Sequence, residues 1–167
     1  MKKRFLVLVA VLFLMAVDLY AAPGDVNVEG YLYVPNRPAF SISLSNNWTA
    51  GGVIKFDLIV VNNGNHYDPS TGRFTAPVSG LYQICFGGRQ DSDSAYQTSY
   101  ADIRVNGSPV PGGRAYSRGK TDTEPYDFSF KCIILNLAAG DYVDIQNMVS
   151  GVGWAASPYT LFSGHLL

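Results

Sequence analysis

Apolar and polar side chains alternate with a period of two along most of the chain after residue 37. Residues 40–45 alternate apolar and hydroxyl side chains without a break, and another run places Tyr82, Ile84 and Phe86 on one face. No 3.6-residue period accompanies these runs, so the pattern predicts β-strands that each bury one face. The same alternation recurs at residues 54–60, 103–105, 133–137, 143–145 and 161–167.

Short turn-forming segments separate the predicted strands. They lie at residues 62–65, 68–72, 106–107 and 139–141, and each contains glycine together with asparagine or aspartate. Asn106-Gly107 favours a two-residue hairpin, because a type I′ turn requires positive φ at both central residues. Many short strands with turns at roughly 8–12-residue spacing predict an antiparallel all-β sandwich or barrel. No repeat or linker interrupts residues 30–167, so we expect one domain.

The first residues follow a different pattern. Three basic residues at positions 2–4 precede an apolar run at residues 5–17, and the small residues Ala21 and Ala22 follow. This arrangement predicts a secretory signal peptide over residues 1–21 and export of the remaining chain to the extracellular space. A membrane anchor is the alternative, but the apolar run is shorter than the roughly 20 residues that a spanning helix needs. We expect a secreted protein without a membrane span.

Composition narrows the class of protein further. The chain has 167 residues, of which 47% are hydrophobic and 15% are charged. These values suit one domain with a sizeable core and exclude an intrinsically disordered chain. Because 12 Lys and Arg residues face 13 Asp and Glu residues, the chain has no basic excess with which to bind a phosphate backbone. Nucleic acid is therefore not an expected partner.

Secretion affects the interpretation of the cysteines and of two asparagines. Cys85 and Cys132 can pair in an oxidising compartment, or they can remain two buried thiols, and the sequence leaves both alternatives open. Asn47-Trp48-Thr49 and Asn106-Gly107-Ser108 both fit the acceptor pattern for N-glycosylation. Asn47 is the preferred candidate because it lies in a polar, turn-like segment, whereas Asn106 lies in a predicted tight turn.

No motif for catalysis or for a structural metal is found. His66 and His165 are isolated, and the chain contains no H-E-x-x-H, C-x-x-C or G-x-S-x-G. Segment 119–121 resembles the end of a phosphate-binding loop, but it lacks the glycine required upstream, where Arg114 stands. Segment 91–93 resembles the start of a calcium loop without its later glycine and glutamate. We expect no enzymatic activity; a secreted hydrolase would require a histidine beside an exposed nucleophile.

One longer pattern extends from residue 56 to residue 86. It runs Phe56-x5-Asn62-x4-Tyr67-x6-Phe74-x5-Gly80-x-Tyr82-x-Ile84-x-Phe86. This pattern resembles the signature of the globular C1q domain, with Ile84 where that family usually has an aromatic residue. Later positions match the penultimate region and the closing strand of the family, namely Gly140, Asp141, Phe162 and Gly164. The resemblance covers residues 38–167.

The resemblance implies a ten-stranded jelly-roll sandwich of the C1q and tumour-necrosis-factor type, assembled as a homotrimer. It also implies that the strands containing Cys85 and Cys132 lie side by side in the sheet nearest the threefold axis. Leu81, Gln83 and Cys85 would then face neighbouring subunits. Burial of Cys85 at the axis would keep it from reaching Cys132, so the resemblance leaves their pairing open.

Two departures from the family bear on assembly and metal binding. Residues 22–37 leave room for only a short N-terminal arm before the globular domain at residues 38–167, in place of a collagen stalk. Some relatives bind calcium at the trimer apex through a pair of aspartates. Asp127 matches the second of these positions, but Gly119 falls at the first. This argues against calcium by that route, although Asp122 and Glu124 are near, and no other cofactor is expected.

The resemblance implies a recognition module that binds microbial or glycan surfaces in innate immunity, in the manner of a lectin. The candidate ligand-binding residues are Arg114, Tyr116, Arg118 and Lys120, which we expect on a glycine-rich loop. Three cations and a ring can hold an anionic sugar through charge-assisted hydrogen bonds and stacking, whereas the alternative is an ordinary solvated loop. The second functional hypothesis is an extracellular signalling or scaffolding ligand for a cell-surface protein receptor, as in cerebellin-like and adipokine-like relatives.

Overall fold

The computed structural model describes residues 37–90, 98–118 and 127–167. The predicted signal peptide and nearly all of the predicted N-terminal arm lie outside these residues, and so does Lys120. Within the described residues every strand pairing is antiparallel. No helix of the described part has the length and hydropathy that crossing a bilayer requires.

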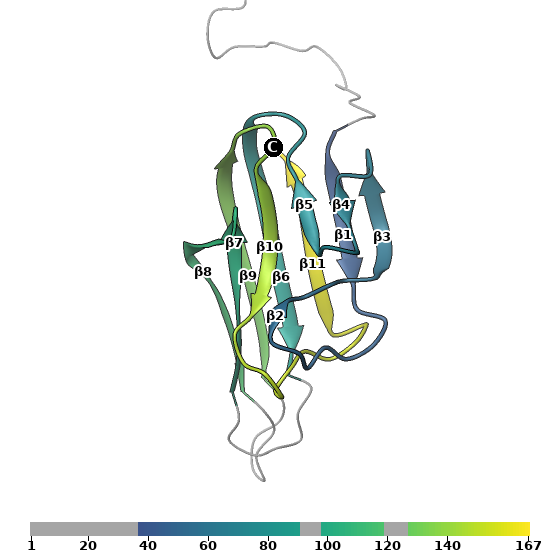
Figure 1. Cartoon of the computed structure of the whole chain (residues 1–167), viewed down its shortest axis with the longest axis vertical. Helices are drawn as coiled ribbons and strands as arrows, with labels where there is room; N and C mark the ends of the chain where they lie inside the picture. The colour runs from purple at the N-terminus through teal and green to yellow at the C-terminus, as the bar shows by residue number, and fades with distance from the viewer. Residues whose placement is uncertain (1–36, 91–97, 119–126) are drawn as a thin grey trace, which may run out of the picture. The chain divides into compact units, whose positions relative to one another are not determined.

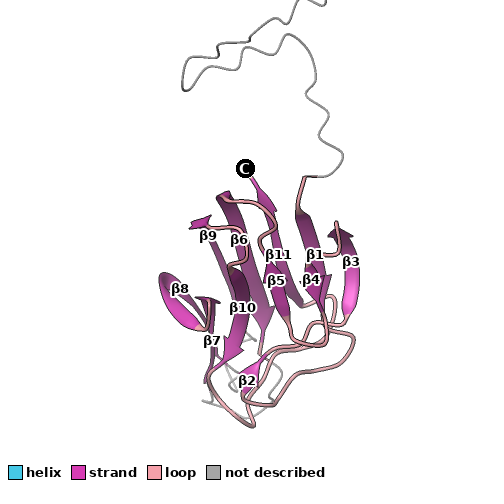
Figure 2. Ribbon diagram, turned by 45° about the horizontal axis from the view of Figure 1, so that its top comes forward, coloured by secondary structure: helices cyan, strands magenta, loops and turns pink. Residues whose placement is uncertain are grey.

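The strands form two sheets that are stacked face to face (Figures 1 and 2). The first sheet has, in order, β3 (Leu58–Asn63), β1 (Ala39–Ser43), β11 (Thr160–Leu166), β6 (Gly80–Arg89) and β9 (Phe128–Leu137). The second sheet has, in order, β4 (Tyr67–Asp68), β5 (Arg73–Thr75), β10 (Tyr142–Asn147), β7 (Thr98–Val105) and β8 (Ser108–Arg118), and β2 (Gly52–Val53) also pairs with β10.

This architecture confirms the predicted two-layer, all-β fold. The described residues contain eleven strands where the resemblance implied ten, and two of them, β2 and β4, have only two residues each. The predicted hairpin at residues 106–107 joins β7 to β8. Asn106 and Gly107 have φ values of 50° and 81°, as the predicted turn type requires.

Aromatic rings from both sheets fill the space between the layers. The ring of Phe40 on β1 lies 4.5 Å from that of Phe74 on β5 and 4.8 Å from that of Phe162 on β11, measured between centroids. Phe86 packs edge-on against Trp154 at 5.0 Å. All five side chains are buried, and rings of this size span the ~10 Å that separates packed sheets. The apolar positions of the sequence signature are therefore core positions.

The spacing of Phe56, Asn62 and Tyr67 in the signature has a hydrogen-bonding cause. The Tyr67 hydroxyl donates to the Phe56 carbonyl at 3.0 Å and accepts from the Phe56 N–H at 3.1 Å. The Asn62 side chain accepts from the Tyr67 N–H and donates to the Tyr67 carbonyl. Burial raises the pKa of the Tyr67 hydroxyl above its ordinary value of 10.0. These bonds fix the turn that leads from the first sheet to the second.

Gly164 of the signature is required by close packing. A Cβ atom there would lie 2.7 Å from Ile84 Cδ1 and 2.8 Å from Phe40 Cε1, which is closer than real Cβ contacts allow. The strand β11 can therefore pass between its neighbours only with glycine at this position.

The prediction of one strand over residues 54–60 is wrong. Ile54 and Phe56 are fully buried, but Leu58 and Val60 of the same alternation are exposed. The Ile54 N–H donates to the Ile145 carbonyl of the second sheet, and the chain then crosses to the first sheet, where β3 begins at Leu58. The apolar run changes sheets partway, so its residues do not share one face.

Candidate recognition surfaces

The predicted ligand-binding residues lie on the edge strand of the second sheet. Arg114, Tyr116 and Arg118 are in β8 and exposed, while the residues between them are buried. The expectation of a glycine-rich loop is therefore wrong for these three residues, because alternation along a strand presents them on one face. Lys120 lies outside the described residues. The structure thus brings three of the four candidates to the same surface.

Arg114 is held by a carboxylate on the neighbouring strand. Asp102 of β7 lies directly opposite, and it accepts from Arg114 Nε at 2.6 Å and from Nη2 at 2.8 Å. This hydrogen bonding raises the pKa of Arg114. The guanidinium also lies 5.8 Å from the centre of the Tyr100 ring, and Tyr100 stacks on Tyr116 with centroids 6.2 Å apart. The guanidinium plane is fixed by both contacts.

A second forked ion pair lies further across the same face. Asp144 of β10 accepts from Arg104 Nε at 2.7 Å and from Arg104 Nη2 at 3.0 Å. Arg73 of β5 approaches the same carboxylate from the other side, with its Nε 3.6 Å away. The Arg73 guanidinium lies 4.1 Å from the centre of the Tyr142 ring, a cation–π contact.

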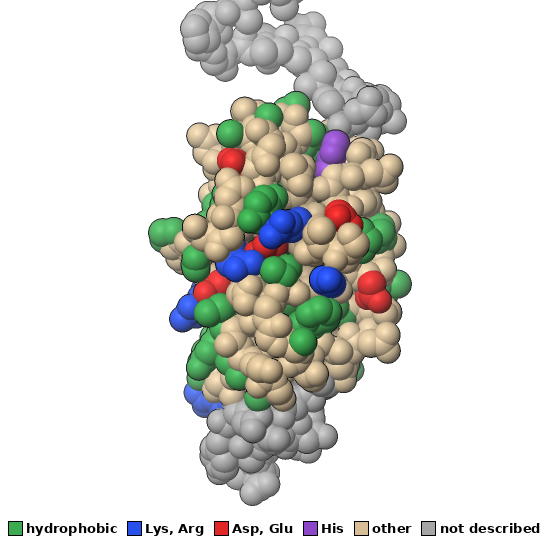
Figure 3. Space-filling model, in the orientation of Figure 1, with side chains coloured by type: hydrophobic (Ala, Val, Ile, Leu, Met, Phe, Trp, Pro, Cys, Tyr) green, Lys and Arg blue, Asp and Glu red, His purple; other side chains and the backbone are tan. Residues whose placement is uncertain are grey.

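These side chains form one continuous strip across the second sheet, which we call the arginine–tyrosine band. Its members are Arg73, Tyr100, Asp102, Arg104, Arg114, Tyr116, Tyr142 and Asp144. Figure 3 shows this face of the molecule, with basic side chains over β10, β7 and β8 and acidic ones between them. Beside the band, Arg118 Nη2 approaches the Tyr116 hydroxyl at 3.5 Å, and this contact lowers the pKa of Tyr116.

Sequence reasoning identified the polar faces of β7 and β10 but missed the band. Asp102, Arg104 and Asp144 alternate with buried apolar neighbours, which marks them as outward-facing. Their pairing depends on which residues oppose each other across strands, and alternation within one strand does not contain that information.

The outer face of the first sheet is apolar. Leu81 of β6 and Ile134 of β9 have exposed fractions of 52% and 63%, and Phe130 is also exposed. A groove of about 320 Å³ crosses the middle of this face, where β1 and β11 carry small side chains. We call this surface the apolar face; the groove is lined by Ala39, Phe40, Ser41, Val61, Gln83, Cys85, Ser163, Gly164 and His165.

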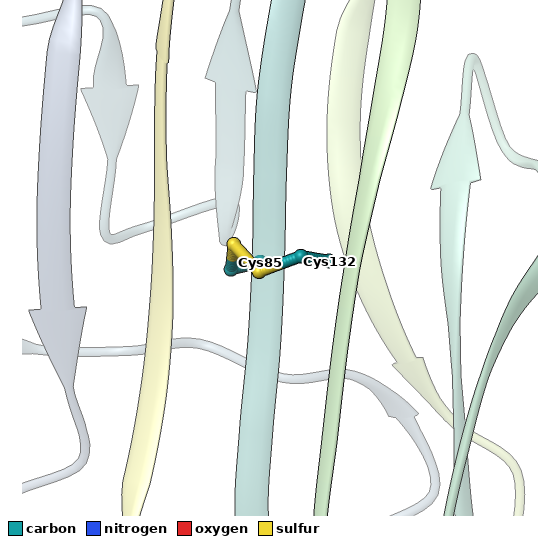
Figure 4. The surroundings of a disulfide bond; sticks show 2 residues. All are labelled: Cys85 and Cys132. Atoms are coloured by element: carbon teal, nitrogen blue, oxygen red, sulfur yellow. A yellow bond between two sulfur atoms is a disulfide. The ribbon is translucent and has the colours of Figure 1, made fainter.

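A disulfide joins the two central cysteines on the apolar face. Cys85 and Cys132 lie directly opposite each other on β6 and β9, with Cα atoms 4.1 Å apart, and their sulfurs are bonded (Figure 4). The sequence and the family resemblance left this pairing open, and the structure contains the bond. Opposed residues of adjacent antiparallel strands point to the same side of the sheet, so a position facing the axis is compatible with the bond.

The two candidate glycosylation sites differ in their surroundings. The side chain of Asn106 is engaged on both sides, since its Nδ2 donates to Asp141 Oδ1 at 2.8 Å and its Oδ1 accepts from the Tyr142 N–H. The bond from Asn106 Nδ2, together with one from the Ala138 N–H, lowers the pKa of Asp141, and these two bonds hold this signature residue in the turn that follows β9. Asn47 is exposed, and its Oδ1 accepts from the Ala156 N–H at 2.7 Å. Glycosylation at Asn47 stays a prediction.

The described residues contain no cluster of three or more His, Cys, Asp or Glu side chains that could hold a metal ion. Asp127 is exposed, and its backbone N–H donates to the Arg118 carbonyl at 3.2 Å. Gly119, Asp122 and Glu124 lie outside the described residues. The prediction about calcium therefore stays a prediction.

Comparison with known proteins agrees with the resemblance. A family model for the C1q domain matches residues 39–167. Complement C1q tumor necrosis factor-related protein 3 of Mus musculus and of Homo sapiens are each 33% identical to the chain over 132 residues. The match covers 77% of this chain and 50% of each relative, so the chain spans about half the length of these relatives.

Solved structures share the fold at low sequence identity. The globular domain of a zebrafish complement 1qA protein has a TM-score of 0.61 at 19% identity, covering 78% of this chain and 98% of that one. Murine APRIL at pH 5.0 has a TM-score of 0.63 at 12% identity, covering 78% and 99%. At these identities the likeness shows the jelly-roll fold alone.

Proposed function

The chain belongs to the C1q-domain family, and from this premise we propose that it is a secreted homotrimeric recognition protein that binds glycans on microbial or cell surfaces. It performs no catalysis of its own in this proposal. Secretion is inferred from the basic and apolar pattern of residues 2–22. An innate-immune role follows from the resemblance to the family.

The apolar face supports the homotrimer. Leu81 and Ile134 expose apolar surface on a sheet that the family resemblance assigns to the threefold axis, and Cys85 points the same way. The groove across β1 and β11 provides space for large side chains of a neighbouring copy. Covering such a surface is favourable because apolar area leaves water. The occupants that we propose are two further copies of this chain.

The observation that carries glycan recognition is the exposed arginine and tyrosine surface of β8. Arg114 and Tyr116 project from the second sheet, which association through the first sheet would leave open. A trimer would present three such surfaces, and three weak contacts on one repetitive target give avidity.

Glycan binding is tested on an array with the full secreted chain. We expect selected glycans to be bound, and we expect an R114A/R118A variant to lose most of that signal. R37A is the matched control, because Arg37 is an exposed arginine beside β1 of the other sheet. An array on which wild type binds no glycan would overturn the proposal.

The second candidate function, a ligand for a protein receptor, is favoured by the exposed side chains of β3. Leu58, Ile59 and Val60 have exposed fractions of 41%, 48% and 69% on an edge strand of the first sheet. Exposed apolar side chains on an edge strand favour a contact with another protein. Pull-down from cell-surface extract, before and after enzymatic removal of glycans, separates the two functions: capture that survives glycan removal supports the receptor.

A further inference from the structure

In the arginine–tyrosine band the two carboxylates are buried and the guanidiniums of Arg73 and Arg114 are exposed, whereas the Arg104 side chain is only 17% exposed. The side chains of Asp144 and Asp102 have exposed fractions of 0% and 3%. The side chains of Arg73 and Arg114 have exposed fractions of 42% and 58%. Each carboxylate is covered by the guanidinium that bonds to it. The surface that a ligand meets is therefore rich in N–H donors and poor in carboxylate oxygens.

The exposed guanidiniums keep donors that the ion pairs do not use. A guanidinium has five N–H groups, and the bonds to Asp102 occupy only Nε and one N–H of Nη2 of Arg114. Arg73 lies beyond hydrogen-bonding distance of Asp144, at 3.6 Å, and is held mainly over the Tyr142 ring. Both groups are oriented in advance, which lowers the entropy cost of binding a planar acid group.

The spacing of these donors selects an extended ligand. Arg73 is on β5 and Arg114 is on β8, with β10 and β7 between them. Neighbouring strands lie about 4.8 Å apart, so the backbones of β5 and β8 are separated by roughly 14 Å. The two guanidiniums lean inward and contact two different carboxylates, Asp144 on β10 and Asp102 on β7. One acid group cannot contact both, whereas a chain with repeated acid groups can. Between and beside the donors, Tyr100 and Tyr116 offer ring surface suited to the C–H face of a sugar.

We propose that the arginine–tyrosine band binds an acidic polysaccharide, whose sulfate or carboxylate groups accept hydrogen bonds from Arg73 and Arg114. This inference rests on the proposed glycan recognition. It adds that the ligand is acidic and names the residues that bind its acid groups. A polysaccharide is favoured over nucleic acid because the predicted secretion places the chain outside the cell and because the tyrosine rings suit the C–H face of a sugar.

The test measures binding of the full secreted chain to immobilised dextran sulfate, polygalacturonate and uncharged dextran. We expect binding to one or both acidic polymers and none to dextran, with affinity falling as salt rises. An R73Q/R114Q variant should lose affinity by about tenfold for each arginine removed. R114K should bind more weakly than wild type, because lysine keeps the charge but lacks the planar guanidinium with its paired N–H donors.

The controls separate this inference from the wider proposal. R37Q removes one exposed arginine elsewhere and should bind like wild type, and circular dichroism verifies that every variant is folded. Preference between the two acidic polymers identifies sulfate or carboxylate as the ligand group, and either result supports the site. Equal binding to duplex DNA, or unchanged affinity of R73Q/R114Q, would overturn the site. Binding of neutral array glycans alone would overturn the site and leave glycan recognition standing.

Discussion

On the first sheet the outward positions of β6 and β9 hold Leu81 and Ile134, whereas on the second sheet the outward positions of β5 and β8 hold Arg73 and Arg114. Both sheets bury aromatic and aliphatic side chains on their inner faces. They differ in what their outer faces gain from contact, because apolar surface is stabilised when it is covered and guanidinium groups lose hydration when they are covered.

The two faces also differ in how their strands are held together. A covalent bond joins Cys85 and Cys132 across β6 and β9 on the apolar face. Forked ion pairs join Arg104 to Asp144 and link β7 to β10 on the other. One alternating pattern thus builds two surfaces of different chemistry, and we propose self-association for the apolar one and ligand binding for the arginine-rich one.

A charged substitution on the apolar face should have the largest effect, which is loss of the proposed trimer. An I134E substitution places a charge on a strongly exposed side chain, so the fold should be kept. Association through that face should be lost, because a buried unpaired charge costs several kcal/mol. Mass-resolved chromatography should report a trimer for wild type and a monomer for I134E. V78E is the control, since Val78 is exposed in the turn before β6, and a trimeric I134E would contradict the proposed use of this face.

Removing the disulfide should have the next largest effect, a decrease in the free energy of unfolding. The bond closes a loop with a sequence separation of 47 residues. A C85S/C132S variant should therefore be less stable by about 3–4 kcal/mol on the loop-entropy estimate. Urea unfolding of wild type with and without reductant provides the control, because reduced wild type should coincide with the variant. Equal stability of all three samples would show that the bond contributes nothing to the free energy of unfolding.

Breaking an ion pair of the band should be costly only where the arginine, like its carboxylate, is largely shielded from water, as it is for Arg104 (side chain 17% exposed) and not for Arg114 (58%). R104Q leaves Asp144, with an exposed side-chain fraction of 0%, without its forked partner, and a loss of about 2–4 kcal/mol is expected. R104Q/D144N should recover much of this loss, since no charge is then left buried. R114Q removes a more exposed partner and should cost about 1 kcal/mol or less. Urea midpoints that rank R114Q below R104Q would refute this account.

The layers of this fold could be predicted from the sequence because alternation and turn residues act locally. The buried positions of Phe40 and Phe86 follow from the strand period, and the hairpin at Asn106-Gly107 follows from the φ values that its turn requires. Arg114 and Tyr116 were proposed as ligand-binding candidates from their chemistry, and the structure shows them exposed on β8. Each of these conclusions uses neighbours along one segment of chain.

The remaining features depend on which strands are paired and in what register. The glycines that suggested a loop belong to an irregularity in β8, where pairing shifts between Asp102 and Arg104 and Gly112 has a φ of 75°. That shift is what brings Arg114 opposite Asp102. The disulfide likewise depends on the register of β6 and β9. Alternation marks a residue as outward-facing, but only the cross-strand register supplies its partner.

The smallest predicted effect concerns carboxylates that lie outside both faces. Hydrogen bonds from Ser45 hold the pKa of Asp57 below its ordinary value of 3.8, and bonds from Ser70 and Asn106 act likewise on Asp68 and Asp141. The folded state therefore binds fewer protons than the unfolded state. This stabilisation is complete above the unfolded pKa and is lost as pH falls from about 4 through the lower folded values.

A D57N variant should remove the part of the acid-induced loss of stability that is due to Asp57. Its urea midpoint should fall less than that of wild type between about pH 5 and pH 2, because asparagine has no proton to gain. S45A should act in the same direction, since the Ser45 hydroxyl is the main donor to Asp57. If both variants keep the full acid dependence of wild type, the carboxylates responsible do not include Asp57. Asp57 lies outside the band and the groove, so neither variant should alter the mass of the proposed trimer or the binding of polysaccharide. Both variants therefore test folding stability independently of the functions proposed for the two faces.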